Sequence, residues 1–216
     1  MTDAAPPPGR WDCDEELIAR ARADDRPRAR AYAWPPPGAP RVAVVVGRGG
    51  RPEVEVDLAA ARADGVPVLR RRGGGCAVVL DPGNMIVSLA LPLPGVGGIT
   101  SAFARVSAWL IDGLADCGVP GVTQEGTSDL ALAGRKVGGS CIWRTQGLVY
   151  YSTTLLVAPD LALAERYLPH PPREPAYRAG RPHREFMGAL RELDRSLTPA
   201  ELVRRLAPFQ RELPRL

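Results

Sequence analysis

Residues 69–84 read LRRRGGGCAVVLDPGN, with three arginines and three glycines between two apolar stretches. The stretches 66–71 and 76–80 predict strands, and 85–91 predict a third strand after an Asp-Pro-Gly turn. Glycines let a backbone turn bring its N–H groups against an anion, and arginine makes charge-assisted contacts to phosphate or carboxylate. The segment is a candidate anion-binding loop, and a plain glycine-rich hairpin turn is its structural alternative. It lacks the GK[ST] ending of a Walker loop and any GxGxxG spacing.

A second segment, residues 127–141, reads TSDLALAGRKVGGSC and contains Lys136, the single lysine among 28 lysines and arginines. Arginine serves elsewhere in this chain wherever a positive charge suffices. A retained lysine therefore indicates a position that needs a compact ammonium group, which the planar guanidinium does not imitate. The alternative is an exposed lysine in a hairpin turn.

The chain around these segments alternates between strand and helix patterns. Residues 12–23, 56–64 and 99–117 predict helices in the first half, and residues 42–46 form a β-branched run typical of a buried strand. In the second half, residues 119–123, 129–133, 136–144 and 148–157 predict strands, while residues 160–167, 184–193 and 198–206 predict helices. Residues 169–182 are proline-rich and predict a surface loop. The pattern predicts an α+β fold with a largely antiparallel central sheet flanked by helices.

Composition narrows the class of protein. With 216 residues, 45% of them hydrophobic, the chain suits one packed domain at residues 11–190, after an unstructured segment 1–10 and before a short helical tail 191–216. The net charge of +4 comes without a basic stripe interleaved with aromatics, which argues against nucleic acid. No apolar run of about 18 residues predicts a membrane span. Without a secretory start, and with four widely spaced cysteines, we expect a cytoplasmic protein with reduced thiols.

The two segments together resemble a known family. The order RRxxGGxAVxxDxGN, then SDLxxxGRKVxGS, then a strand ending in TLLV resembles the catalytic domain of lipoate–protein ligases and their octanoyltransferase relatives. The resemblance runs from about residue 12 to residue 190. It implies a biotin/lipoate ligase-like fold. It also implies a two-step reaction, in which lipoate and ATP form lipoyl-AMP and a lysine of a lipoyl-carrier domain then takes the acyl group.

Carried onto this chain, the resemblance places Lys136 beside the acyl-phosphate junction as a catalytic charge anchor. Asn84 and Asp129 would belong to the nucleotide and magnesium side, with Asp129 as a tentative Mg²⁺ ligand. The remaining expected binding residues, for lipoate and ATP, are Arg70, Arg71, Gly73, Gly74, Gly75, Cys76, Gly139, Ser140, Cys141, Ser152 and Thr154.

This chain departs from the family pattern at several positions. The family usually has a glycine where Cys76 stands, a histidine where Leu80 stands, and a His-Gly pair where Ser152 and Thr153 stand. The chain ends soon after the family's closing segment. We therefore expect no separate C-terminal accessory domain, and an accessory subunit becomes a candidate partner for the adenylation step.

Two alternatives stay open at this point. An octanoyl- or lipoyltransferase would pass the acyl group through a cysteine thioester, which needs an activated thiol. Cys76 and Cys141 are the cysteines that could face the pocket, although each fits better as a small buried hydrophobe. The second alternative is a non-catalytic paralogue that binds lipoate without modifying an acceptor.

Overall fold

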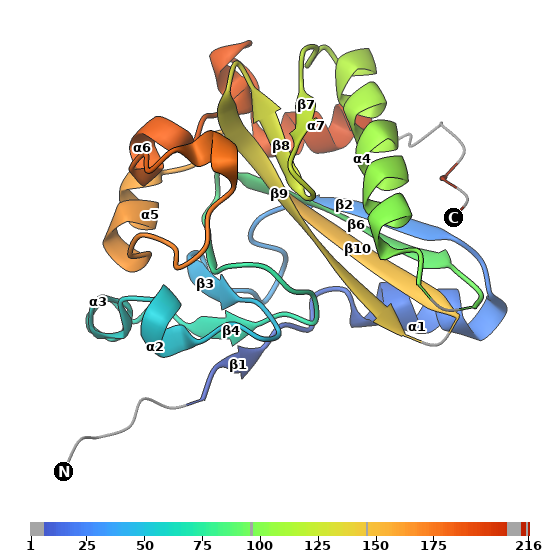
Figure 1. Ribbon diagram of the computed structural model, residues 1–216, viewed down its shortest axis with the longest axis horizontal. Coiled ribbons are helices and arrows are strands. Elements are labelled where there is room, and N and C mark those ends of the chain that lie inside the picture. The colour runs from blue at the N-terminus through green and yellow to red at the C-terminus, as the bar shows by residue number, and fades with distance from the viewer. Residues whose placement is uncertain (1–6, 96, 146, 207–212, 215) are drawn as a thin grey trace.

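The computed structural model describes residues 7–95, 97–145, 147–206, 213–214 and 216. Its strands form a six-stranded sheet of order β2-β6-β10-β9-β8-β7 and a four-stranded sheet of order β1-β4-β3-β5 (Figure 1). The strands are β1 Gly9–Arg10, β2 Arg28–Ala33, β3 Ala43–Val46, β4 Val68–Arg70, β5 Val78–Leu80, β6 Asn84–Pro92, β7 Thr123–Glu125, β8 Asp129–Leu132, β9 Arg135–Thr145 and β10 Leu148–Leu156. The α-helices are α1 Glu15–Asp24, α2 Pro52–Glu55, α3 Leu58–Ala63, α4 Ile99–Asp116, α5 Leu161–Tyr167, α6 His183–Phe186 and α7 Pro199–Leu206, and the 3₁₀ turns are η1 Ala176–Arg178 and η2 Leu190–Glu192.

The six-stranded sheet is antiparallel throughout, which confirms the predicted α+β class. β6 and β10 pair along nine residues each and form its centre. Successive side chains of a strand point to opposite faces, so each strand serves two environments. Tyr151 and Leu155 of β10 face the hydrophobic core, while Tyr150 and Ser152 face the other side.

The helix α4 covers the core face of this sheet together with α7 (Figure 1). Its apolar residues Val106, Leu110 and Leu114 recur at helical spacing and are fully buried. Each such side chain contributes about 1.5–3 kcal/mol to folding. Leu202 and Leu206 of α7 join the same core, so the C-terminal segment packs against the domain.

The four-stranded sheet forms the second layer of the molecule. Its strand β3 is buried on both faces, as the β-branched run 42–46 predicts. It pairs in parallel with β4 and antiparallel with β5. Tyr167 and Ala61 pack on one face, from α5 and α3, and Trp11 and Trp34 stack 5.6 Å apart on the other. This packing fixes the loop between β4 and β5, which carries the three glycines.

Several predicted elements differ from the structure. The expected helix 56–64 is the shorter α3, which begins at Leu58 because Asp57 accepts from the Ala60 amide at 2.9 Å as its N-cap; the separate helix α2 precedes the expected range. Residues 119–122 form turns, with glycines 118 and 121 at positive φ, and β7 begins only at residue 123. The unstructured segment does not reach residue 10, because Gly9–Arg10 pair with β4; residues 1–6 lie outside the described residues.

The prediction of one helix over residues 184–193 is also wrong. This segment contains the end of the four-residue α6, then extended backbone, and then η2. Met187 is extended and forms a parallel bridge to Lys136, and the Gly188 amide donates to the Lys136 carbonyl at 2.8 Å. Apolar residues recur at helical spacing in this stretch, which is why a helix was predicted. Its backbone at Met187 and Gly188 instead pairs with the start of β9, so it does not form helical hydrogen bonds. The backbone of Lys136 is thereby held from outside its own sheet.

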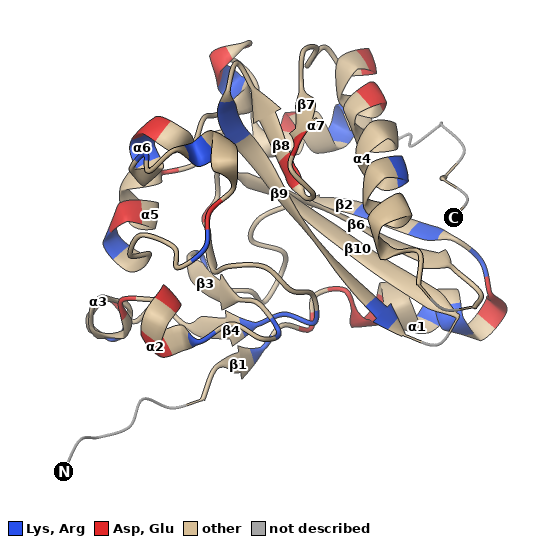
Figure 2. Cartoon of the chain, viewed as in Figure 1, with Lys and Arg blue, Asp and Glu red and all other residues tan. Residues whose placement is uncertain are grey.

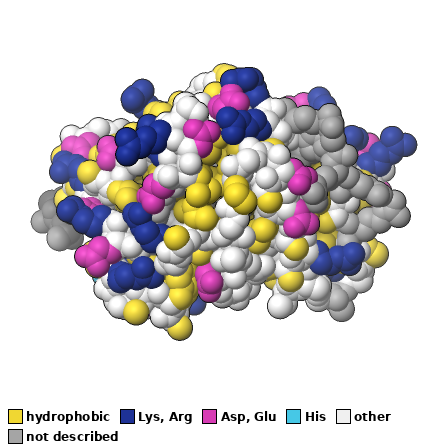
Figure 3. All heavy atoms as spheres, turned by 90° about the horizontal axis from the view of Figure 1, so that it is seen from above, with side chains coloured by type: hydrophobic (Ala, Val, Ile, Leu, Met, Phe, Trp, Pro, Cys, Tyr) yellow, Lys and Arg dark blue, Asp and Glu magenta, His cyan; other side chains and the backbone are white. Residues whose placement is uncertain are grey.

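Charged residues are spread over the helices and hairpins of both layers (Figure 2). On the face shown in Figure 3, hydrophobic side chains gather across the middle and charges of both signs are interspersed around them. Within the described ranges, no helix is long and apolar enough to cross a membrane.

Candidate active site

A cavity of about 620 Å³ lies between the two sheets. Its first wall is the small sheet, with Arg71 and residues 75–80. Its second wall is the face of β9 and β10 opposite α4. Its rim is formed by residues 125–129, 168–169, 171–175, 178, 183 and 186–187. A volume of this size matches a small-molecule site.

Most of the expected site residues line this cavity. They are Arg71, Gly75, Cys76, Asp129, Lys136, Gly139, Ser140, Cys141, Ser152 and Thr154. The structure therefore brings together two segments that are about fifty residues apart in the chain. Arg70, Gly73, Gly74 and Asn84 do not belong to the lining.

Lys136 lies at the start of β9 with its ammonium beside Asp129 of β8. The two side chains form an ion pair, with Lys136 Nζ 2.7 Å from Asp129 Oδ1. The lysine side chain is 26% exposed and the aspartate 11%, so a ligand in the cavity can reach the lysine. A Cβ atom at Gly139 would lie 3.1 Å from Lys136 Nζ, so this glycine leaves room for the lysine along the strand. Within this ion pair, the ammonium of Lys136 is a positive group held in place at a concave, partly desolvated space.

The second oxygen of Asp129 is also occupied. The Tyr177 hydroxyl donates to Asp129 Oδ2 at 2.9 Å. Burial, together with the Asp129 carboxylate, raises the pKa of this tyrosine. The hydroxyl is therefore protonated, and it acts as a donor.

The arginines of the glycine loop are engaged with the protein itself. Arg71 donates to the carbonyls of Val45, Gly74 and Cys76 at 2.7–3.2 Å. Arg70 donates to three carbonyls of residues 47–50. Arg72 forms two hydrogen bonds to Glu15. These guanidinium groups hold the glycine loop in its conformation. Arg70 does not line the cavity, so the structure does not support a direct contact between Arg70 and a ligand there.

Asn84 is fully buried at the start of β6, and its side chain accepts from the Asp81 amide at 2.8 Å. Gly83 next to it faces the Ala158 carbonyl, only 1.9 Å from where a Cβ atom would stand. The Gly-Asn pair therefore closes the turn before β6 tightly. In this structure its role is to shape the sheet junction.

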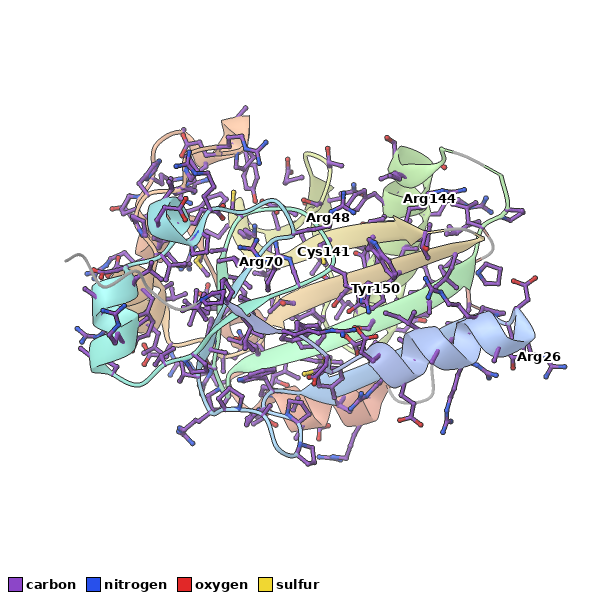
Figure 4. All side chains as sticks on the ribbon, turned by 90° about the horizontal axis from the view of Figure 1, so that it is seen from below. Arg26, Arg48, Arg70, Cys141, Arg144 and Tyr150 are labelled. Atoms are coloured by element: carbon purple, nitrogen blue, oxygen red, sulfur yellow. The ribbon has the colours of Figure 1, made fainter. Side chains whose placement is uncertain are left out.

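The floor of the cavity is polar and rigid. Tyr150 and Ser152 line it, and the Tyr150 hydroxyl donates to the buried Asp14 at 2.6 Å. Ser88 donates to the same carboxylate at 2.9 Å and lies 3.1 Å from the Ser152 hydroxyl. Burial raises the pKa of Tyr150 well above its ordinary value. Figure 4 shows Tyr150 and Cys141 on the neighbouring strands β10 and β9, seen from below.

Two cysteines line the cavity, on opposite walls. Cys141 is buried, and burial raises the pKa of its thiol. Its sulfur occupies the space that a side chain at Gly73 would need. Cys76 is half-buried, with its sulfur 3.7 Å from the Arg173 carbonyl.

The proline-rich segment 169–182 lies mostly at the surface, as expected, and it also closes one side of the cavity. It contributes Arg173, Glu174 and Arg178 to the lining, and Tyr177 to Asp129. Arg178 is 4% exposed, and its Nη2 has no hydrogen-bond partner among the described residues. The prolines of segment 169–182 indicated a loop, but no local sequence signal indicated which part of the molecule this loop covers.

Comparison with known proteins identifies the fold's relatives. Residues 6–209 match the model of the lipoyl protein ligase A/B catalytic domain. This chain belongs to that family. An octanoyltransferase LipM from Symbiobacterium thermophilum is 29% identical over an alignment of 201 residues that covers 82% of this chain and 71% of that protein. A putative lipoate-protein ligase A from Aeropyrum pernix is 35% identical over 116 residues, or 53% of this chain and 43% of the ligase. The chain thus spans less than half the length of this ligase.

Solved structures share the fold. A lipoate-protein ligase A bound with ATP covers 91% of this chain, with a TM-score of 0.74 and 21% identity; the match covers 78% of that structure. A bipartite lipoate protein ligase from Thermoplasma acidophilum covers 97% of this chain, with a TM-score of 0.71 and 22% identity; the match covers 83% of that structure. The lipoyl ligase family includes ligases and acyltransferases, so membership makes this chain an acyl-transferring enzyme of one of these two kinds.

Proposed function

We propose that this chain is the catalytic domain of an ATP-dependent lipoate–protein ligase. Lipoate would occupy the cavity between the two sheets, with its carboxylate at the Lys136–Asp129 pair. Its acyl chain would run along the apolar lining, which includes Val45, Val78, Leu80 and Ile86. The observation that carries this proposal is the single lysine, held at an ion pair inside a cavity.

In the first step, a lipoate carboxylate oxygen attacks the α-phosphorus of ATP, and the bond to the β-phosphate breaks. Pyrophosphate leaves and lipoyl-AMP remains. Negative charge accumulates on the carboxylate and phosphoryl oxygens, and the ammonium of Lys136 is fixed where that charge develops. A preorganised positive group of this kind contributes about 3–4 kcal/mol to lowering a barrier.

In the second step, the amine of an acceptor lysine attacks the acyl carbonyl. An amide bond forms, the carbonyl–phosphate oxygen bond breaks, and AMP leaves as the amine proton is released. Lys136 stabilises the departing phosphate and forms no covalent bond. A protein nucleophile is not required for either step.

The described residues contain no ready-made magnesium site, since no group of three or more metal-binding side chains occurs within the described ranges. Asp129, whose two oxygens accept from Lys136 and Tyr177, is the carboxylate that would face magnesium brought in with ATP. Magnesium that accompanies ATP is usually held by substrate phosphates and one or two carboxylates. No step above depends on it.

The acceptor is proposed to be a lipoyl-carrier domain. The Thermoplasma acidophilum structure is described as a bipartite ligase and its E2 lipoyl domain, and its catalytic fold matches this chain. The same likeness makes an accessory subunit a candidate partner for the adenylation step, and the donor assay below distinguishes a chain that adenylates alone from one that needs this partner.

An octanoyltransferase is the second candidate, because the LipM relative covers most of this chain. That mechanism passes the acyl group through a thiolate. Cys141 is the cavity cysteine on the strand of Lys136, but burial raises the pKa of its thiol and so disfavours the thiolate. This observation argues against Cys141 as the nucleophile, and Cys76 is the other cavity thiol that a transferase could use.

The two candidates differ in their acyl donor. The protein would be incubated with an acceptor lipoyl domain and one of three donors: lipoate with ATP and magnesium, preformed lipoyl-AMP, or octanoyl carrier protein. Intact mass of the acceptor is the readout. The ligase gives product from the first two donors, whereas a missing adenylation partner limits product to lipoyl-AMP. Product from octanoyl carrier protein alone would make the enzyme a transferase, and no product from any donor would favour a non-catalytic lipoate-binding protein.

A further inference from the structure

Tyr177 lies in η1, within the segment that closes one side of the cavity, and reaches the carboxylate that pairs with Lys136. Asp129 Oδ1 accepts from Lys136 at 2.7 Å and Oδ2 accepts from Tyr177 at 2.9 Å. We propose that Tyr177 is a positioning residue: it holds the Asp129 carboxylate, and through it fixes the ammonium of Lys136 in the cavity. This inference rests on the proposed role of Lys136.

A carboxylate with one partner can turn about its last side-chain bond, because the torsion of an aspartate carboxylate is broad. A second donor on the other oxygen defines the plane of the group. Lysine itself has a flexible four-carbon stem, so its ammonium is placed only as well as its partner is. The tyrosine hydroxyl therefore limits where the charge of Lys136 lies.

The tyrosine is in turn held by its own surroundings. Its ring packs on Phe186, with the centroids 5.0 Å apart, and Phe186 is 3% exposed. Arg181 donates through Nη2 to the Tyr177 carbonyl at 2.7 Å and to the Gly134 carbonyl at 3.2 Å. Gly134 lies in the turn between β8 and β9. Asp129 begins the first of these strands, and Lys136 lies near the start of the second. The same arginine thus ties the loop to the hairpin of the catalytic pair.

The backbone of Lys136 is held by the next part of this segment. Its carbonyl accepts from the Gly188 amide at 2.8 Å. The side chain of the lysine is thus placed through Tyr177, and its backbone through Gly188. Residues 177–188 act on the lysine at both ends, although they follow it by about forty to fifty positions in the chain.

The chain offers a direct readout, because Lys136 is its single lysine. Protein labelled with ¹³C-lysine gives one lysine side-chain signal in an NMR spectrum. Tyr177→Phe keeps the ring against Phe186 and removes the hydroxyl. Tyr167→Phe is the matched control, since the Tyr167 hydroxyl donates to Asp64 at 2.6 Å outside the cavity.

In ligand-free protein, Tyr177→Phe should shift or broaden the signal of the lysine ε-carbon, and Tyr167→Phe should leave it in place. In the acceptor assay, Tyr177→Phe should lower kcat about tenfold, as expected for loss of a hydrogen bond to a charged group, with little change in KM for lipoate. A purely structural role would leave the lysine signal unchanged in the folded variant.

A second pair of variants tests whether Tyr177 acts through Asp129. In an Asp129→Asn background, adding Tyr177→Phe should lower kcat little further, because the group being positioned has lost its charge. Equal losses in both backgrounds, or an unchanged lysine signal and kcat in Tyr177→Phe, would overturn the inference. Should wild-type protein modify no acceptor, the proposed function fails, and the NMR signal alone still decides whether Tyr177 positions Lys136.

Discussion

Gly73 of the glycine loop packs directly against Cys141 of β9, and no atom fits between them. A Cβ atom built on Gly73 would lie 2.5 Å from Cys141 Sγ and 2.7 Å from Cys141 Cβ. This contact joins the small sheet to the large one at the cavity. It explains why a glycine that lines no part of the cavity still belongs to the site.

Gly73→Ala should therefore destabilise the protein. The added methyl group overpacks the junction, and such strain costs about 1–3 kcal/mol in the free energy of unfolding. Urea denaturation measures it. Gly74→Ala is the control, since nothing lies within 4 Å of its Cβ position. Cys141→Gly should relieve the strain in the double variant, and a Gly73→Ala protein as stable as Gly74→Ala would contradict this packing.

Gly139→Ala should reduce acyl transfer while the protein stays folded. The new Cβ atom would lie 3.1 Å from both Cε and Nζ of Lys136, so the flexible end of the lysine would have to move off Asp129. A misplaced catalytic group costs about a hundredfold in rate. Gly49→Ala, with open space around its Cβ position, provides the matched comparison in the same assay. Equal activity of the two variants would show that the lysine position tolerates the displacement.

The cavity thiols should be dispensable for the ligase reaction. Because burial raises the pKa of Cys141, the fraction of this thiol present as thiolate at neutral pH is lower than for a free cysteine. Alkylation followed by peptide mass spectrometry should modify Cys76 before Cys141, and bound lipoate should protect Cys76. Cys141→Ala and Cys76→Ala should each keep most of the wild-type rate, within about threefold. Complete loss in one of them would revive the thioester mechanism.

Stability should fall in acid through Asp64, far from the cavity. Hydrogen bonds from Arg166 and Tyr167 lower the pKa of this carboxyl from 3.8 to about 2. A carboxyl whose folded-state pKa is depressed contributes stability above its unfolded pKa, and that contribution is lost as the pH falls from 3.8 toward 2. The Asp64→Asn protein should lose this part of the pH dependence of stability and keep the part that comes from other titrating groups. Thermal midpoints measured across that range for both proteins test the assignment, and parallel curves would refute it.

The sequence predicted the family, the α+β class and the Lys136 hairpin, because these depend on local patterns and on spaced motifs. It missed β2, since RARAYA contains no β-branched residue and its apolar face consists only of small alanines, two of which, Ala29 and Ala31, pack against the core. Arg71 was expected to bind a ligand; it lines the cavity, and its guanidinium also donates to three backbone carbonyls of the loop and of β3. An arginine beside glycines has the same local pattern in both roles, so only the folded geometry distinguishes them.

The contribution of Tyr177 could not be predicted for a related reason. It meets Asp129 across 48 positions of the chain, from a segment whose prolines and arginines predict only an exposed loop. Which carboxylate a distant hydroxyl reaches depends on how the loop folds back over the sheet. Lys136 could be singled out from the sequence, because it is the single lysine in a chain whose other basic side chains of this kind are arginines.

The central claim is that Lys136 acts as a compact positive charge at the acyl-phosphate junction. The most direct test is the intact mass of an acceptor lipoyl domain after incubation with lipoate, ATP and magnesium, using wild-type and Lys136→Arg protein side by side. Wild-type protein should add one lipoyl group, and Lys136→Arg should be slower by about a hundredfold or more, although the charge is kept. An arginine variant as fast as wild type would contradict the account.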